Sequence, residues 1–147
     1  MEYLVDTNIL LRLLQRNDSL NPVIRNAVRK LRNNGNILLI TPQNCAEFWN
    51  VSTRPATKNG FGLTPKDADR QLKLIERIFP LLSDIPTVYP EWRRLVVKFG
   101  VSGVQVHDAR LAATMKANNI TYILTVNTGD FNRYHSEGII AVNPNSV

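Results

Sequence analysis

The sequence predicts an α/β fold, a three-layer α/β/α sandwich with a central, mostly parallel sheet. Short, fully apolar segments typical of buried parallel strands alternate with longer segments of helical periodicity. Parallel strands need crossover connections, usually helices, so this alternation predicts helices on both faces of the sheet. We expect strands over residues 3–6, 37–40, 122–126 and 139–142, and a further short one at 81–82.

The helices are predicted from their start and stop signals. Asn21-Pro22 is typical of an N-cap followed by proline at the first helical position, and Gly35 ends that helix. Thr41-Pro42 and Thr64-Pro65 open two more in the same way. The remaining helices are expected directly after the first strand, from Pro90 to Gly100, and from about Val106 to Asn118.

Length and composition are those of a globular protein. With 147 residues we expect a single domain over 1–147, and 44% hydrophobic against 20% charged residues argues against disorder. No apolar run approaches the roughly 18 residues that span a bilayer, and no basic-then-apolar leader is present, so we expect a cytoplasmic protein without a membrane segment. The single cysteine, Cys45, excludes an internal disulfide and a multi-cysteine zinc site.

The charge balance favours a polyanionic partner. Lys and Arg number 18 against 12 Asp and Glu, a formal net charge of +6. An excess of this sign raises the encounter rate with nucleic acid, although many basic proteins bind none.

Four acidic residues fall where α/β folds place their chemistry. Asp6 ends the first strand, Asp130 lies just beyond the 122–126 strand, Asp108 is in the first turn of its helix, and Glu47 follows the second strand by about two helical turns. Ligands of open α/β sheets bind outside the carboxyl ends of the strands. We therefore expect these four side chains to converge.

Each acid alone has an ordinary structural interpretation. Asp6 suits a helix N-cap, Asp108 a favourable charge at a helix N-terminus, Asp130 beside Gly129 a turn, and Glu47 a solvated helix position. Together, however, four converging carboxylates would repel one another, and a divalent cation removes that penalty. Oxygen ligands suit Mg²⁺ or Mn²⁺, which can activate water for phosphodiester hydrolysis.

At these residues the chain resembles PIN-domain nucleases and, within them, the VapC-type toxins of toxin–antitoxin pairs. The matching segments span residues 5–131 in order: Val5-Asp6-Thr7-Asn8, Glu47, His107-Asp108-Ala109, and the Thr-x-Asn-x-x-Asp-Phe run from Thr125 to Phe131. The resemblance implies one PIN-like nuclease domain: a Mg²⁺- or Mn²⁺-dependent endoribonuclease, the toxin of a type II pair. Its implied partners are an RNA substrate and a cognate antitoxin protein. A second copy in a homodimer is expected from the apolar helix positions considered below.

The resemblance also implies the roles of individual residues. Asp6 and Asp108 would be the principal metal ligands, and Glu47 and Asp130 would complete the catalytic acidic site directly or through water. The implied supporting residues, which would hold the first helical turn and hydrogen-bond within the site, are Thr7, Asn8 and Asn127.

Several interpretations stay open from the sequence. Arg54, Lys58 and Arg110 are candidate RNA contacts, with solvated surface charge as the alternative for each. His107 beside Asp108 suggests a general base, but a metal site already supplies the nucleophile. The alternative to a nuclease is a non-cleaving PIN-fold module that binds RNA or protein. Apolar positions around Leu10, Ile24 and Leu72 suggest either core or a partner surface.

Overall fold

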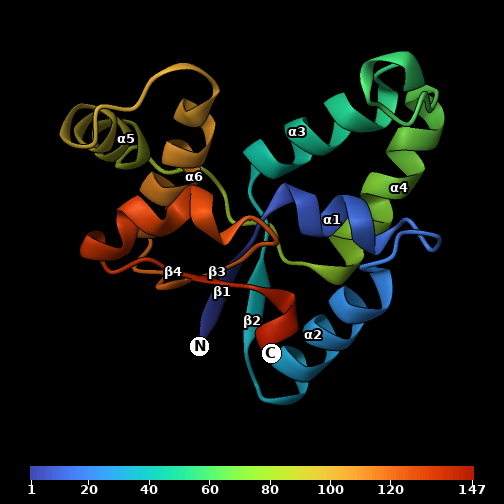
Figure 1. Cartoon of the computed structure of the whole chain (residues 1–147), viewed down its shortest axis with the longest axis horizontal. Coiled ribbons are helices and arrows are strands. Elements are labelled where there is room, and N and C mark those ends of the chain that lie inside the picture. The colour runs from blue at the N-terminus through green and yellow to red at the C-terminus, as the bar shows by residue number, and fades with distance from the viewer.

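A four-stranded parallel sheet of order β2-β1-β3-β4 lies at the centre of the computed structural model, which describes residues 1–147 (Figure 1). Its strands are β1 (Glu2–Val5), β2 (Ile37–Leu39), β3 (Tyr122–Leu124) and β4 (Ile140–Val142). In this register Leu4 pairs with Leu39 on one side and Ile123 on the other. Because every pairing is parallel, all four carboxyl ends meet at one edge.

Six α-helices connect and cover the strands: α1 (Thr7–Leu13), α2 (Asn21–Asn33), α3 (Pro42–Thr53), α4 (Pro65–Ile78), α5 (Val88–Lys98) and α6 (Val106–Ala117). Short 3-10 helices are η1 (Ala56–Lys58), η2 (Gly103–Gln105), η3 (Thr128–Glu137) and η4 (Pro144–Ser146). The predicted caps of α3 and α4 are confirmed, since the hydroxyls of Thr41 and Thr64 accept from backbone N–H groups in the first helical turns.

The strands bury both faces, which confirms the three-layer prediction. Tyr3 and Val5 of β1 face a first core built with α1, α2, α3 and α4, whereas Leu4 between them faces a second core built with α5, α6 and η3. This alternation follows from the two-residue period of a strand. Full burial of a side chain such as Leu4 stabilises the fold by about 1.5 to 3 kcal/mol.

The structure corrects three local predictions. Leu20, rather than Asn21, is the N-cap of α2, and the buried Asn21 amide instead donates to the carbonyls of Arg12 and Leu13 at the end of α1. Helix α5 begins at Val88 rather than at the predicted Pro90. A proline in the first turn of a helix breaks no hydrogen bond, so the helix can include the two residues before it. The expected strand at 81–82 is a single bridge from Leu81 to Ile40.

The apolar helix positions that suggested a partner surface are mostly core. Leu10, Ile24 and Ile75 are fully buried within the chain. Leu13 and Leu72 are partly buried and pack against the first core. These residues therefore do not by themselves form a free apolar face. No helix has both the length and the apolar character needed to cross a membrane.

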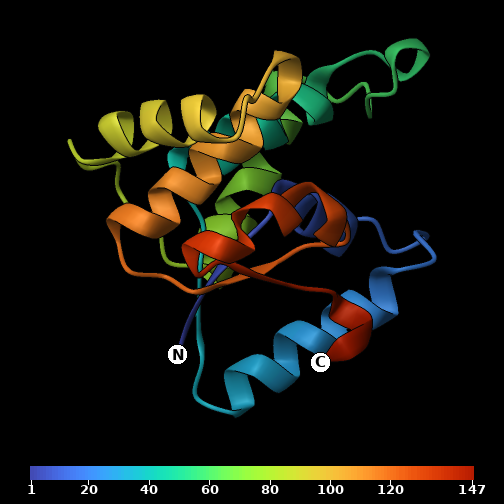
Figure 2. The same cartoon turned by 60° about the vertical axis from the view of Figure 1, so that its left-hand side comes forward.

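Two helical arms rise beside the carboxyl edge of the sheet, α3–α4 on one side and α5–α6 on the other (Figures 1 and 2). The tip of the first arm folds back on α3, where the N–H groups of Phe61 and Gly62 donate to the carbonyls of Val51 and Arg54. A Cβ atom at Gly60 would lie 1.9 Å from the Arg54 carbonyl oxygen, so only glycine fits this turn.

Candidate active site

Asp6 lies at the carboxyl end of β1 and is both the N-cap of α1 and part of the acidic site. Its Oδ1 accepts from the Thr7 N–H at 2.8 Å. Its Oδ2 accepts from the Thr125 hydroxyl at 2.7 Å and the Asn8 amide at 3.1 Å. These three donors fix a carboxylate that is only 7% exposed.

Glu47 is held one helical turn after Gln43 on α3. The Gln43 amide donates to Glu47 Oε1 at 2.7 Å, and the Thr7 hydroxyl lies 3.4 Å from Oε2. The buried Asn44 amide donates in turn to the Thr7 hydroxyl at 3.0 Å. The start of α1 and the start of α3 are thereby joined beside the Glu47 carboxylate.

Asp108 and Asp130 come from the opposite side of the sheet. Asp108 is half-buried in the first turn of α6, and the Gln43 amide also donates to the carbonyl of neighbouring His107 at 2.8 Å. Gln43 therefore bridges Glu47 to the helix that carries Asp108. Asp130 is exposed on η3, where its N–H donates to the Asn127 carbonyl.

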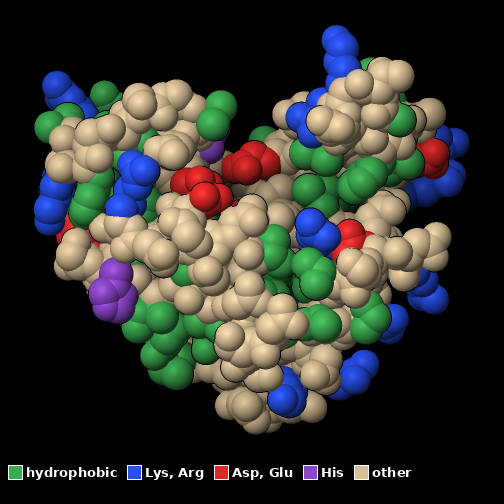
Figure 3. Space-filling model, viewed as in Figure 1, with side chains coloured by type: hydrophobic (Ala, Val, Ile, Leu, Met, Phe, Trp, Pro, Cys, Tyr) green, Lys and Arg blue, Asp and Glu red, His purple; other side chains and the backbone are tan.

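The four carboxylates are close enough to perturb one another. Burial raises the pKa of Asp6 to about 6, hydrogen bonds from Thr125 and Thr7 oppose that rise, and Glu47 and Asp130 add to it. Burial raises the pKa of Asp108 to about 7, with further increases from Asp6, Asp130 and Glu47. The charges of Glu47 and Asp130 thus act on both Asp6 and Asp108. Acidic side chains also lie at the bottom of the hollow between the two arms (Figure 3).

These residues fit a hard divalent cation. None of the four acids forms an ion pair with Lys or Arg, so no basic side chain of the protein neutralises them directly. No three of these side chains lie close enough together to coordinate one metal ion without other ligands. Mg²⁺ usually keeps several waters and binds through one or two carboxylates, so an open oxygen-rich site of this kind suits it.

The predicted supporting residues differ in their contacts. The Thr7 N–H donates to Asp6 and its hydroxyl to Glu47. The Asn8 amide donates to both Asp6 and Thr125, while its own oxygen accepts from the Val126 N–H. The Asn127 side chain is exposed without a hydrogen bond, and only its backbone N–H contacts Thr125. The hydrogen bond expected of the Asn127 side chain is therefore not formed in this structure, and its supporting role stays a prediction.

The candidate RNA contacts also differ. Arg54 is occupied in its own loop, where its guanidinium donates to the Asn59 carbonyl at 3.0 Å. Lys58 is exposed without an ion pair, whereas Arg110 pairs loosely with Asp84 at 3.4 Å. The His107 side chain is exposed, and its backbone carbonyl accepts the hydrogen bond from Gln43. Cys45 is half-buried and free.

Two positioning residues are missing from the sequence predictions, Gln43 and Thr125. Both are buried, at 6% and 0% exposed. Thr125 stands inside the Thr-x-Asn motif and Gln43 stands one turn before Glu47. The position of a polar residue one helical turn from a candidate ligand was the available signal for Gln43.

Replacing Thr125 with valine should weaken metal binding by about 10- to 100-fold, the usual effect of losing a residue that orients a ligand. The change keeps the buried shape but removes the 2.7 Å bond to Asp6. Calorimetric titration with Mn²⁺ measures the affinity directly. Thr125→Ser, which retains the hydroxyl, is the matched control, and equal affinities in the two variants would contradict this role.

Comparison with known protein families agrees with this geometry. The PIN domain family matches residues 3–136 of the sequence. The chain belongs to the PIN domain family. The resemblance inferred from the acidic motifs is thereby confirmed at the level of the family. No curated protein matches the sequence significantly.

Solved structures share the PIN fold at low sequence identity. VapBC2 from Rickettsia felis, bound to a DNA fragment from its promoter, is 17% identical with a TM-score of 0.70 over 97% of this chain and 98% of that one. VapBC-1 from nontypeable Haemophilus influenzae is 17% identical with a TM-score of 0.68 over 98% of both chains. Mycobacterium tuberculosis VapC20, a Sarcin-Ricin loop cleaving toxin, is 13% identical with a TM-score of 0.65 over 95% and 98%.

Proposed function

We propose that this PIN-domain protein is a Mg²⁺- or Mn²⁺-dependent endoribonuclease. The observation that carries the proposal is the set of four mutually repelling carboxylates of Asp6, Glu47, Asp108 and Asp130. Acidic side chains lie at the bottom of the hollow between the arms (Figure 3). Asp6 and Asp108 would hold the cation, with Glu47 and Asp130 contributing directly or through water. A cation bound there would lower the pKa of a water molecule and offset charge developing on the phosphate.

The chain's own residues supply the pre-organisation. Three donors keep the Asp6 carboxylate in one orientation, so it does not have to be ordered when the cation binds. Gln43 keeps Glu47 and the start of α6 together. A scissile phosphate would lie between the arms, where the acids from both sides of the sheet reach it.

An assay with and without metal tests the proposal. Purified protein should cleave mixed single-stranded RNAs in Mg²⁺ or Mn²⁺, lose activity in EDTA, and regain it when the cation is restored. RNA binding without cleavage under all three conditions would instead support a non-cleaving PIN-fold binding module. That alternative needs the basic surface but no intact set of four acids.

Basic side chains would attract the RNA, since the net charge is +6 and Lys and Arg lie on both arms (Figure 3). The logarithm of affinity should fall linearly with the logarithm of salt concentration, with a slope of roughly −2 to −3 for three or four phosphate contacts. Fluorescence anisotropy of a labelled RNA bound to the Asp6→Asn variant measures this slope without cleavage.

Exposed Lys58 and loosely paired Arg110 are the candidates for these phosphate contacts. Lys58→Gln and Arg110→Gln should each reduce the salt slope by up to about one unit. Arg29→Gln, on α2 away from the hollow, is the matched control and should leave it unchanged (Figure 1). An RNA affinity that does not change with salt concentration would contradict the use of the positive charge for RNA binding.

A role as the toxin of a type II pair, with an antitoxin partner and a homodimeric assembly, belongs to the same proposal. Its support is the fold shared with the VapBC assemblies and with VapC20. Induced expression of the wild-type chain should arrest bacterial growth, whereas Asp6→Asn should not. Light scattering tests the dimer, and a monomer at high concentration would remove it.

A further inference from the structure

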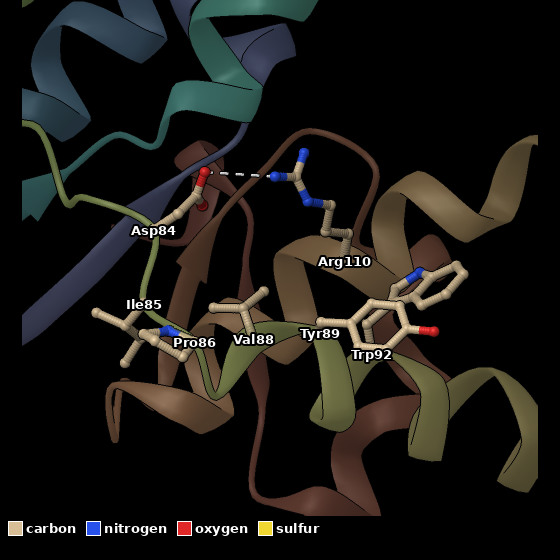
Figure 4. Close-up of a pocket in the computed structure, with 7 residues that line it drawn as sticks. All are labelled: Asp84, Ile85, Pro86, Val88, Tyr89, Trp92 and Arg110. Carbon is tan, nitrogen blue, oxygen red and sulfur yellow. Dashed lines mark hydrogen bonds and ion pairs between the residues drawn. The ribbon is translucent and has the colours of Figure 1, made fainter.

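A pocket of about 390 Å³ lies between the start of α5, the loop that precedes it and Arg110 of α6 (Figure 4). Tyr89 and Trp92 of α5 provide aromatic walls, and Ile85 and Val88 provide apolar surface. Its volume is in the range of small-ligand pockets, which combine apolar walls with a few polar groups. Of its lining residues, only Arg110 has a role proposed above, as a candidate phosphate contact.

One aromatic wall, Trp92, is held in place, and the other, Tyr89, has an exposed ring. The Trp92 indole N–H donates to the Val106 carbonyl at 2.9 Å, which fixes the ring against the start of α6. Tyr89 lies 6.0 Å from Trp92 between ring centroids and is 64% exposed. An exposed aromatic ring beside a fixed one offers a stacking surface for another flat ring.

The polar rim carries one charge of each sign. Arg110 and Asp84 face each other across the top of the pocket at 3.4 Å, and their side chains are 43% and 45% exposed (Figure 4). An exposed pair at this distance is weak. A phosphate would compete for the Arg110 guanidinium, which suits its geometry, and Asp84 would then be free to accept N–H groups from a base.

The first turns of α6 carry one residue of the pocket, Arg110, and one of the acidic site, Asp108. Trp92 bonds to Val106, two positions before Asp108, and Arg110 follows Asp108 by two positions. Residues two apart on a helix point to nearly opposite sides, so the acid and the guanidinium address different sides of one short segment. An RNA strand that crosses the start of α6 would therefore contact both Asp108 and Arg110.

We infer that this pocket binds one unpaired nucleotide of an RNA strand, with the base stacked on Tyr89 and Trp92 and its phosphate on Arg110. The inference rests on the proposed ribonuclease function and assigns it a single-stranded substrate near the cut. A base within a duplex has both faces covered by its neighbours, so only an unpaired base can enter. Stacking on aromatic side chains is the usual means of holding such bases.

Direct binding of a mononucleotide tests the pocket without cleavage. The chain has two tryptophans, so the Trp49→Phe variant leaves Trp92 as the sole indole reporter. In EDTA, guanosine 5′-monophosphate should quench its fluorescence saturably. Tyr89→Ala should weaken this binding about tenfold, the typical loss of one stacking partner. Arg110→Gln should weaken binding of the nucleotide but not of guanosine. Val97→Ala, further along α5, is the matched control.

Several outcomes would overturn the inference: no saturable quenching at millimolar nucleotide, equal binding of ribose 5-phosphate, or an unchanged affinity in Tyr89→Ala. Conversion of a dimer to a monomer by Tyr89→Ala, with nucleotide binding intact, would assign this face to a second copy. The two proposals fail separately. Nucleotide binding by a protein that cleaves no RNA would refute only the nuclease, and cleavage without nucleotide binding would refute only the pocket.

Discussion

Replacing Asp6 or Asp108 with asparagine should lower the rate of RNA cleavage by at least about a hundredfold while the protein stays folded. Each change removes a ligand charge and keeps the side-chain volume. Loss of a residue that only orients a metal ligand already costs about 10- to 100-fold, so loss of the ligand itself should cost at least as much. Initial rates on a fluorescently labelled RNA at saturating Mg²⁺, with circular dichroism as a check on folding, give the comparison.

Two further variants make this prediction specific. Asp69→Asn applies the same chemical change to an acid of α4 that pairs with Lys73, and it should retain full activity. Asp130→Asn should have a smaller effect than Asp6→Asn, because Asp130 is exposed and its carboxylate has no hydrogen bond within the chain. Full activity in purified Asp6→Asn or Asp108→Asn would refute the assignment of the site.

The metal-free protein should melt at a higher temperature at pH 5.5 than at pH 8. The folded-state pKa values of Asp6 and Asp108, about 6 and about 7, lie above the ordinary value of 3.8. Between these values the folded state binds more protons than the unfolded state, so stability rises as pH falls through this window. Glu137, whose pKa is lowered by Arg94, acts in the opposite direction but only below its ordinary value of 4.5.

Metal and mutation should remove this pH dependence. At 100 times its dissociation constant, Mg²⁺ stabilises the folded state by about 2.7 kcal/mol, or roughly 5 to 10 °C for a chain of this size. Asp108→Asn in EDTA should melt above the wild type at pH 8 and vary less with pH. Differential scanning calorimetry measures each case. A wild-type melting temperature that falls between pH 8 and pH 5.5 would contradict the inference that the carboxylates repel one another in the folded state.

Much of the fold follows from local sequence signals. Apolar runs such as Ile37–Ile40 specify buried strands, and Thr41-Pro42 specifies a helix start, because each depends on neighbouring residues alone. The placement of Asp6 at a strand end follows equally from its neighbours. The rule that parallel strands end at the same edge then brings Asp6 and the segment with Asp130, which follows β3, to one side of the sheet.

What the sequence misses are hydrogen bonds between distant segments. Thr125 reaches Asp6 across 119 positions, and Gln43 reaches His107 across 64. Asn21 illustrates the same limit: its local pattern favours a cap on its own helix, yet burial places its amide against the carbonyls that end α1. In each case tertiary packing decides which acceptor a buried donor finds.

The acidic site joins elements that pack on opposite sides of the sheet. Asp6 and Glu47 come from elements of the first core, whereas Asp108 and Asp130 come from elements of the second. The four carboxylates thus come from two separately packed layers, and a relative movement of these layers would separate them. A cation bound by acids of both layers would restrict that movement. Adding Mg²⁺ should accordingly slow amide hydrogen exchange in both arms together.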